Sequence, residues 1–332
     1  MNPEHVKHLR CPKTKCKLDV EIGELENGKI KTGNLIALNN GKKYPIIDFI
    51  PRFVPEKNYA ANFGIEWNIH NRTQFDDSSG FNVSEERFRH ETKWGYKLEG
   101  EIILEAGSGS GRFTKHALET KAMVISFDFS SAVEANYKSN GHAQNLLIVQ
   151  ASIYEMPFED SYFDRVFCFG VIQHTPKPRW AFSCLVSSLK NGGHLSSDIY
   201  LKSFSKIYTT PKYLIRKVTK KMNPQKLYKY TVRYINFMWP IARLIMKIPV
   251  IGKKINWRLM IADYSILLKN ADSKTLKEWA VLDTYDMVSP VYDLPETVKS
   301  FRKWHEDEGL INIDVHRGYN GVEGRATKNK LE

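Results

Sequence analysis

Short apolar runs alternate with amphipathic stretches between residues 101 and 200. The apolar runs predict strands at residues 101–106, 122–127, 145–149, 163–169 and 193–200. The amphipathic stretches predict helices at residues 111–120, 130–140 and 178–190. Strands and helices that alternate in this way build βαβ units around a parallel sheet. The pattern therefore predicts an α/β fold with a doubly wound, Rossmann-like, mostly parallel sheet, which would bind ligands at the carboxyl ends of its strands.

The rest of the chain divides into further segments. Residues 1–55 are rich in turn signals and predict a small β module. Residues 56–100 are polar and aromatic and predict a helical lid or linker. The main domain is expected to span residues 101–330 and to contain a basic helical insertion at residues 201–270. It would close with a helix near residues 295–308 and strands near residues 310–317 and 321–327.

Composition adds one feature to this picture, a concentration of positive charge. The 332-residue chain has a formal net charge of +12. Fifteen of its 49 Lys and Arg residues lie within residues 199–262, which contain no Asp or Glu. Outside this segment acidic residues outnumber basic ones, so the insertion requires an anionic neighbour or extensive hydration.

Four cysteines and the lack of a long apolar run favour a cytoplasmic protein without a disulfide framework.

The first predicted strand of the main domain ends in a glycine-rich turn, Glu105-Ala106-Gly107-Ser108-Gly109-Ser110-Gly111. Glycines permit a sharp turn and a close approach of the backbone to a ligand. The second strand ends at Asp128, whose carboxylate can accept hydrogen bonds from both hydroxyls of a ribose. A dinucleotide fingerprint would require glycine at the position of Arg112, so a different nucleotide cofactor is favoured.

Further motifs follow in order: Met156-Pro157-Phe158, Phe163-Asp164-Arg165-Val166, Gly170-Val171-Ile172-Gln173-His174-Thr175-Pro176 and Leu189-Lys190-Asn191-Gly192-Gly193. With the glycine turn and Asp128 they resemble the class I S-adenosylmethionine-dependent methyltransferases, in the group that includes the quinone-biosynthesis enzymes. The resemblance implies S-adenosyl-L-methionine as cofactor. It also implies the cofactor-binding residues, which are Glu105, Gly107, Ser108, Gly109, Gly111, Asp128, Phe129, Ser152, Ile153, Phe169 and Gly170.

One position departs from that family. Its members commonly have Asp at the end of the third strand, where it hydrogen-bonds the adenine amino group, but this chain has Ser152. Binding is expected to survive, with the serine contacting the base or acting only as a loop residue. His174 follows the fourth strand and is the candidate catalytic base; the alternative is that it caps the next helix or binds a backbone carbonyl. Asp198 and Tyr200 are weaker candidates, expected to line the site.

The N-terminal segment resembles a small zinc-ribbon-like domain that occurs as an activator of tRNA and protein methyltransferases. The resemblance rests on residues 9–18, which contain Cys11 and Cys16, and on residues 43–51. The C-x₄-C spacing is longer than a zinc knuckle requires, and a second cysteine pair is absent. His5 and His8 could complete a set of four zinc ligands with Cys11 and Cys16, but we do not expect this, because His5 lies near the terminus. We therefore expect a β module without metal, and we expect Cys168 and Cys184 to be buried thiols.

The basic insertion mixes Lys and Arg with aromatic and aliphatic residues. Three interpretations remain open, in descending order: a cap over the acceptor site, a face that lies on an anionic membrane surface, and an RNA-binding surface. The sequence thus predicts a cytoplasmic methyltransferase, with a peripheral position at the inner membrane surface as the alternative. Its acceptor would be a small molecule or glycan-type intermediate, phosphorylated or lipid-linked, methylated on oxygen or nitrogen. The alternatives are an RNA methyltransferase and a cofactor-binding scaffold without turnover.

Overall fold

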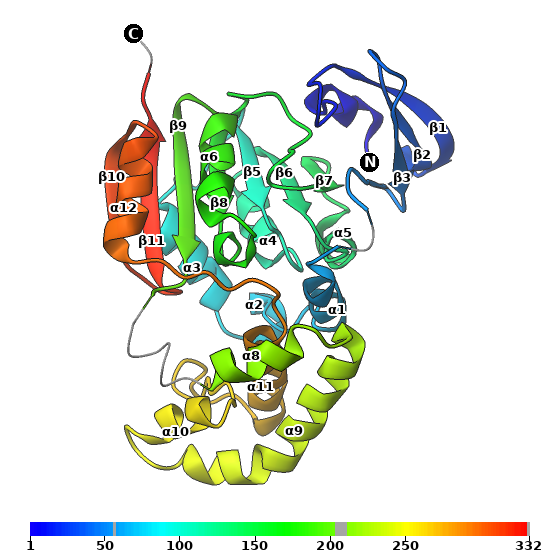
Figure 1. Ribbon diagram of the computed structural model, residues 1–332. Coiled ribbons are helices and arrows are strands. Elements are labelled where there is room, and N and C mark those ends of the chain that lie inside the picture. Colours follow the sequence, from blue (N-terminus) through cyan, green and yellow to red (C-terminus); the bar gives the residue numbers. More distant parts are fainter. Residues whose placement is uncertain (56–57, 203–210, 331–332) are drawn as a thin grey trace.

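The computed structural model describes residues 1–55, 58–202 and 211–330. Part of the basic insertion, including Lys206, lies outside these ranges. Three parts are visible in Figure 1: an N-terminal β module, a central α/β domain, and a helical cap at the carboxyl ends of the parallel strands. Within the described ranges, no helix has the length and hydropathy needed to cross a lipid bilayer.

The central sheet has seven strands in the order β10-β11-β9-β8-β5-β6-β7. Strands β5 to β9 run parallel to one another, whereas β11 is antiparallel to both β9 and β10. Their bounds are β5 Ile102–Ala106, β6 Met123–Asp128, β7 Leu146–Gln150, β8 Phe163–Cys168, β9 Leu189–Ile199, β10 Leu310–Arg317 and β11 Val322–Lys328. The predicted fold class, a mostly parallel doubly wound sheet with an added β module, is confirmed.

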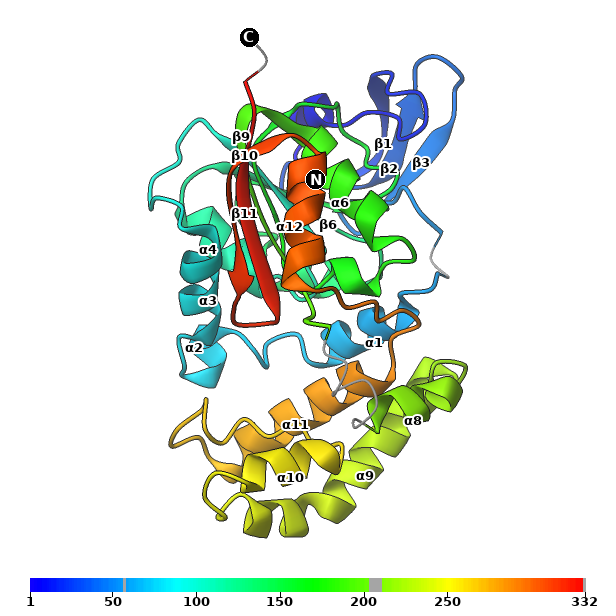
Figure 2. The same ribbon diagram turned by 60° about the vertical axis from the view of Figure 1, so that its left-hand side comes forward.

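Helices cover both faces of this sheet, as Figure 2 shows for α6 and α12 on one side and α3 and α4 on the other. They are α3 Val83–Thr92, α4 Arg112–Glu119, α5 Val133–Asn140, α6 Pro178–Ser188 and α12 Val298–Asp307. Alternate residues of a strand face opposite sides, so the strands feed two separate cores. Leu104 packs with α6 and α12, whereas its neighbour Ile103 packs with α3 and α4. Burial on both faces explains why these strands are almost continuously apolar.

One predicted boundary is wrong. The motif Leu189-Lys190-Asn191-Gly192-Gly193 was expected to be a turn before a strand beginning at Gly193, but β9 already begins at Leu189. Leu189 pairs with Phe163 of β8, and the register then shifts before Arg165 pairs with His194. Gly192, with a φ of 80°, absorbs the irregularity.

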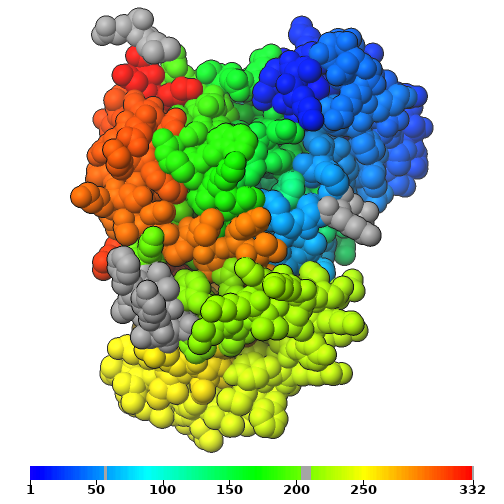
Figure 3. Space-filling model, in the orientation of Figure 1, coloured from blue at the N-terminus to red at the C-terminus, as the bar shows by residue number. Residues whose placement is uncertain are grey.

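The N-terminal module is a four-stranded antiparallel sheet in the order β1-β2-β3-β4, preceded by the 3₁₀ helix η1 Pro3–His8. Its strands are β1 Leu18–Glu26, β2 Lys29–Ala37, β3 Lys43–Ile47 and β4 Ile50–Pro51. In Figure 3 the module, in blue, lies directly against the green α/β domain. Its apolar residues, including Leu9 and Leu35, belong to the same buried cluster as Leu104.

Two helical segments lie over the carboxyl ends of the strands. The lid comprises α1 Ala61–Ile69 and α2 Asp76–Ser79. The cap comprises α8 Lys212–Thr219, α9 Pro224–Ile245, α10 Gly252–Arg258 and α11 Ser273–Val288, so its helices continue beyond the predicted end at residue 270. The cap has its own core, in which Ile235 and Trp239 of α9 pack with Leu276 and Trp279 of α11. Lid and cap together enclose space above the sheet.

Candidate functional site

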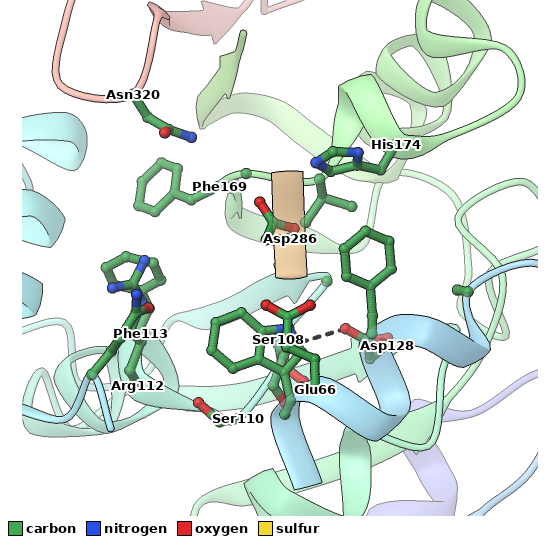
Figure 4. Close-up of a pocket in the computed structure, with 18 of the residues that line it drawn as sticks. Glu66, Ser108, Ser110, Arg112, Phe113, Asp128, Phe169, His174, Asp286 and Asn320 are labelled. Carbon is green, nitrogen blue, oxygen red and sulfur yellow. Dashed lines mark hydrogen bonds between the residues drawn. The ribbon is translucent and has the colours of Figure 1, made fainter. Parts of the chain in front are cut away.

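A cavity of about 200 Å³ lies between the carboxyl ends of the central strands, the lid and the cap. Its floor is formed by the glycine turn after β5 and by residues that follow β6, β7 and β8. Helix α1 supplies one wall, and α11 supplies the roof. Figure 4 shows Ser108, Asp128, His174, Glu66 and Asp286 around this common space. The cavity therefore joins segments that are far apart in the sequence.

The glycine turn needs its glycines for two different contacts. Gly109 has a φ of 52°, and a Cβ there would lie 3.1 Å from Nε1 of Trp67, so the lid indole approaches the bare backbone closely. Gly111 has a φ of 86°, and a Cβ there would lie 2.1 Å from Oδ1 of Asn136 on α5. One glycine thus belongs to the cavity, whereas the other lets α5 pack against the turn.

Asp128 lies beside this turn at the end of β6. Its Oδ2 accepts a hydrogen bond of 3.0 Å from the backbone N–H of Gly109, shown as a dashed line in Figure 4. Its Oδ1 accepts from the N–H of Ser130 at 2.8 Å and from the hydroxyl of Ser130 at 2.7 Å. Burial raises the pKa of Asp128, and the hydrogen bonds oppose that rise. Oδ2 keeps a lone pair free, and the rotatable hydroxyl of Ser130 can turn away from Oδ1, so the fixed side chain can still accept ligand hydroxyls.

The structure brings most of the predicted cofactor residues together. Eight of them line the cavity: Gly107, Ser108, Gly109, Asp128, Phe129, Ile153, Phe169 and Gly170. Glu105, Gly111 and Ser152 are not among the lining residues. The hydroxyl of Ser152 instead accepts a hydrogen bond of 3.2 Å from the N–H of Tyr154. The neighbouring Ile153, rather than Ser152, faces the cavity after β7.

Glu105 lies beneath the turn in a buried polar network. Its Oε2 accepts hydrogen bonds from the hydroxyls of Thr114 and, at 2.7 Å, Ser126. Asn136 donates to both of these hydroxyls at 3.0 Å. Burial raises the pKa of Glu105 to about 7, although the two hydroxyl donors oppose the rise. The residue therefore connects β5, α4, β6 and α5 below the cavity floor.

His174 is in the 3₁₀ helix η2 Ile172–His174, which follows β8, and it lines the cavity. Its Nδ1 lies 2.9 Å from the backbone carbonyl oxygen of Tyr292. Because a carbonyl can only accept, Nδ1 carries a proton, which leaves the lone pair of the neutral ring on Nε2. The ring packs edge-on against Tyr200 and beside Phe63, with centroid distances of 5.3 and 5.1 Å. Its carbonyl-bound tautomer fits both predicted roles, base and backbone anchor.

Three carboxylates of the lid and roof form what we call the acidic wall: Glu66, Asp283 and Asp286. Glu66 is fully buried, and neither of its carboxylate oxygens has a hydrogen-bond partner in the described part of the chain. Burial, reinforced by the charges of Asp286 and Asp283, raises the pKa of Glu66 well above its usual value. Burial and the charge of Asp286 raise the pKa of Asp283 to about 7. Asp286 accepts a hydrogen bond of 3.2 Å from the Tyr200 hydroxyl.

Besides Arg87, a second cation, Arg112, also lines the cavity. It is the first residue of α4, and its guanidinium lies 4.5 Å from the ring centroid of Phe113. Burial, together with the charge of nearby Arg87, lowers the pKa of Arg112 to about 10, and the charge of Asp283 opposes this change. Among the described residues, no carboxylate lies within ion-pair distance of Arg112. The cavity therefore presents both signs of charge and suits a zwitterionic or cationic ligand.

Asp198, a weaker base candidate, is not a lining residue. It is fully buried at the end of β9, where Oδ2 lies 2.5 Å from Nη2 of Arg87. Its Oδ1 accepts from the N–H of Gly170 at 2.5 Å, and Asn320 donates to Oδ2 at 3.2 Å. Arg87 also pairs with Glu91 at 2.5 Å. Asp198 thus fixes the backbone after β8 from behind the cavity, whereas Tyr200, the other weak candidate, does line it.

The cysteines of the N-terminal module make hydrogen bonds within the protein. Sγ of Cys11 lies 3.2 Å from the Tyr44 hydroxyl, and Cys16 donates to Oδ1 of Asn39 at 3.1 Å. Among the residues that the structure describes, no group of three or more His, Cys, Asp and Glu side chains is placed to hold a metal ion. Cys168 is buried in β8, and Cys184 of α6 is partly buried.

Sequence reasoning missed the acidic wall and Arg112. Asp283 and Asp286 are three residues apart on α11, so they lie on one face of that helix. Glu66 stands next to Trp67 inside an otherwise apolar and amide-rich helix, where a carboxylate is unusual. These local signals existed, but nothing in the sequence indicated that α1 and α11 face the same cavity.

Comparisons with known proteins agree with this geometry. Residues 104–197 match the family model described as "Methyltransferase domain". A phosphoethanolamine N-methyltransferase of Triticum aestivum is 30% identical over 102 residues, covering 29% of this chain and 20% of the relative. A tRNA U34 carboxymethyltransferase of Campylobacter curvus is 26% identical over 125 residues, covering 36% of this chain and 42% of the relative. The chain therefore spans less than half of the length of these curated relatives.

Solved structures resemble the chain more distantly. An O-methyltransferase family protein from Burkholderia thailandensis has 8% identity and a TM-score of 0.45, with 75% of this chain and 57% of that chain covered. A phosphoethanolamine N-methyltransferase of Haemonchus contortus, solved with phosphoethanolamine and S-adenosylhomocysteine, has 17% identity and a TM-score of 0.36, with 46% and 34% covered. On its matched motifs and sheet order, the chain contains a class I methyltransferase domain, whose cofactor is S-adenosylmethionine.

Proposed function

We propose that this protein transfers a methyl group from S-adenosylmethionine to an amine or hydroxyl group of a small-molecule or glycan-type acceptor. The observation that carries the proposal is the position of Asp128 beside the turn Gly107 to Gly111, in the floor of a cavity closed by lid and cap. The likeness of the motifs to quinone-biosynthesis methyltransferases supports a small acceptor. The likeness of the N-terminal module to the zinc-ribbon-like activators of tRNA methyltransferases supports the alternative, an RNA acceptor.

The cavity fits the cofactor on observations independent of the motifs. The turn leaves backbone exposed where a side chain would fill the space, and Asp128 keeps a lone pair free on Oδ2. Asp128 would accept the ribose hydroxyls, and Phe129 and Ile153 would flank the adenine. Arg112 would pair with the carboxylate of the methionine part. When bound, S-adenosylmethionine supplies an electrophilic methyl group on a positively charged sulfur.

The acidic wall supports an amine as the acceptor. Glu66 has no partner of its own there, and an ammonium group would favour the charged forms of the carboxyl groups around it. A protonated amine must lose a proton before its nitrogen can accept a methyl group, and a base with a pKa near the working pH removes it most effectively. Asp283, with a pKa raised to about 7, meets that condition. Nε2 of His174, which also lines the cavity, is the second candidate base. The amine in the name of the Triticum aestivum relative supports the same acceptor class.

RNA is the second candidate acceptor, because the name of the Campylobacter curvus relative and the basic insertion both favour it. The distribution of charge favours the small acceptor. The acidic wall faces the cavity, whereas exposed lysines and arginines such as Lys229 and Arg243 lie on the outside of the cap. A phosphate backbone would be attracted to the outer surface and repelled at the entrance to the cavity. Both the acidic wall of the cavity and the basic outer surface of the cap are compatible with a phosphorylated or lipid-linked small acceptor.

Calorimetric titration with S-adenosylmethionine tests the proposal. We expect the wild type to bind and Asp128→Ala to bind about tenfold or more weakly, because two charge-assisted hydrogen bonds are lost. Asp160→Ala is the matched control, since the Asp160 side chain is 74% exposed and remote from the cavity. Unchanged affinity in Asp128→Ala would show that Asp128 does not bind the ribose of the cofactor. Binding of a nicotinamide dinucleotide instead would overturn the cofactor assignment, and binding without product across amine and hydroxyl acceptors would indicate a scaffold.

A further inference from the structure

Helix α9 presents an apolar stripe on its exposed side. The stripe consists of Tyr230, Tyr234, Phe237, Ile241 and Leu244, spaced four, three, four and three residues apart. This spacing places all five side chains on one face of the helix. Phe237 is 77% exposed and Leu244 is 65% exposed. The apolar side chains continue beyond the helix at Ile248, Val250 and Ile251, all of which are exposed.

Apart from the Tyr234 hydroxyl, which donates to the backbone carbonyl oxygen of Leu259, the described part of the cap does not use this stripe for its own stability. Helix α9 is held by a different face, on which Leu227, Ile235, Trp239 and Ala242 are buried. Two of these residues, Ile235 and Trp239, pack with α11 in the core of the cap. Figure 1 shows α9 along the outer edge of the cap, away from the α/β domain. The stripe is therefore an additional apolar surface, and contiguous exposed apolar surfaces commonly mark interaction sites.

A row of positive charge runs beside the stripe. Lys226, Lys229, Arg233, Arg243 and Lys247 are all exposed. Within the described ranges, none of the five has a carboxylate at ion-pair distance. The surrounding sequence has no acidic residue between positions 199 and 262. Apolar and cationic side chains therefore share the exposed half of one helix, which is the arrangement of helices that lie in a membrane interface.

We propose that this face of α9 docks on an anionic lipid bilayer. The stripe enters the boundary between headgroups and acyl chains, where Tyr and Phe are favoured. The basic row binds anionic headgroups by electrostatic attraction near such a surface. A second copy of the chain fits less well, because it would bring two uncompensated basic rows together. RNA fits less well because Ile241 and Leu244 have no aromatic ring on which bases could stack.

Docking through α9 has a consequence for the cavity. The buried face of α9 packs on α11, and α11 carries Asp283 and Asp286 of the cavity roof. The docking face and the cavity roof are therefore joined through the packed helix pair α9 and α11. An acceptor held at the membrane surface by a lipid tail would be delivered next to the cap. The docking itself does not depend on the proposed methyl transfer.

Flotation of the full chain with vesicles tests this face. We expect binding to vesicles that contain phosphatidylglycerol, little binding to pure phosphatidylcholine, and weaker binding as salt is raised. The double variant Phe237→Glu, Leu244→Glu should lose about tenfold or more in vesicle affinity, because it removes apolar contacts and adds repelled charges. The matched control is Ile22→Glu, Leu25→Glu, which changes two exposed apolar residues of the N-terminal module and should bind as the wild type does.

Titration with S-adenosylmethionine, run on the same samples, separates this proposal from the methyltransferase proposal. Both double variants should bind the cofactor as the wild type does, which shows that they are folded. Failure of the wild type to bind phosphatidylglycerol vesicles would overturn the membrane proposal. Equal loss in the control variant would also overturn it. A concentration-dependent dimer that the α9 variant abolishes, without vesicle binding, would assign the face to a second copy of the chain instead.

Discussion

Asp283 illustrates how a buried carboxylate makes stability depend on pH. Burial and the charge of Asp286 raise its pKa to about 7 in the folded protein, from 3.8 when it is exposed. A raised folded-state pKa means that the folded state holds the proton more tightly than the unfolded state. The stability from this group is therefore complete below about pH 4 and is lost as the pH rises to about 7.

We predict that Asp283→Asn removes this loss. Relative to the wild type, the variant should gain up to about 4 kcal/mol of unfolding free energy between pH 4 and pH 8. Urea titrations of the ligand-free proteins across this range would measure the difference. The control is Asp160→Asn, a change at an exposed carboxylate. Its unfolding free energy should change with pH in the same way as that of the wild type. A constant difference between Asp283→Asn and the wild type would show that Asp283 is ionised in the folded protein throughout.

At the scale of single residues, the sequence identified the part of the site that is local. The turn Gly107 to Gly111 and Asp128 belong to consecutive strands, and parallel strands end at one edge of the sheet. The acidic wall could not be found in this way. Glu66 and Asp283 are more than two hundred positions apart, and only the packing of lid against cap makes them neighbours. Ser152 and Glu105 occupy family positions, yet neither lines the cavity, whereas Ile153, one residue after Ser152, does.

Helix α3 depends on one buried ion pair for its position. Arg87 of α3 lies within 2.5 Å of both Glu91 and Asp198, and all three side chains are almost completely buried. Removing the cation leaves two carboxylates without compensation in a region of low dielectric. The same change frees Asp198, which holds the N–H of Gly170 at the edge of the cavity.

Arg87→Met should therefore destabilise the fold by about 3–5 kcal/mol. The free energy of unfolding in urea measures this loss. The control is Arg72→Met, since Arg72 pairs with Asp77 at the surface with both side chains more than 40% exposed. That substitution should cost about 1 kcal/mol or less. Similar costs for the two variants would mean that the buried network contributes no more than a surface pair.

At the scale of elements, the strands were predictable because continuous apolar runs are typical of a sheet buried on both faces. The predicted strands and the observed β5 to β8 differ only at their ends. The boundary at Leu189 was wrong because strand pairing with β8 overrode the glycine signal. The full extent of the cap was missed because α11 contains acidic residues, whereas positive charge had been used to define the insertion.

The whole molecule depends on a core shared by the N-terminal module and the α/β domain. Leu9, Leu35 and Leu104 belong to one buried cluster that crosses the junction. Lys15 reinforces the junction by donating to the carbonyl oxygens of Met156 and Phe158, both at 3.0 Å. The module is therefore attached by apolar burial and hydrogen bonds to the backbone, which suffice for a small sheet that has an adjacent domain to pack on.

We expect the module to keep its structure without a metal. Three of the four candidate zinc ligands have other partners: His8 contacts the Tyr162 hydroxyl at 2.6 Å, Cys11 contacts the Tyr44 hydroxyl at 3.2 Å, and Cys16 donates to Asn39 at 3.1 Å. We expect a strong chelator to leave the melting temperature unchanged and the protein to unfold in one calorimetric transition. Where zinc organises a small domain, its binding energy is folding energy, so chelation unfolds the domain. A separate early transition that appears only with chelator would therefore place a structural metal in the module.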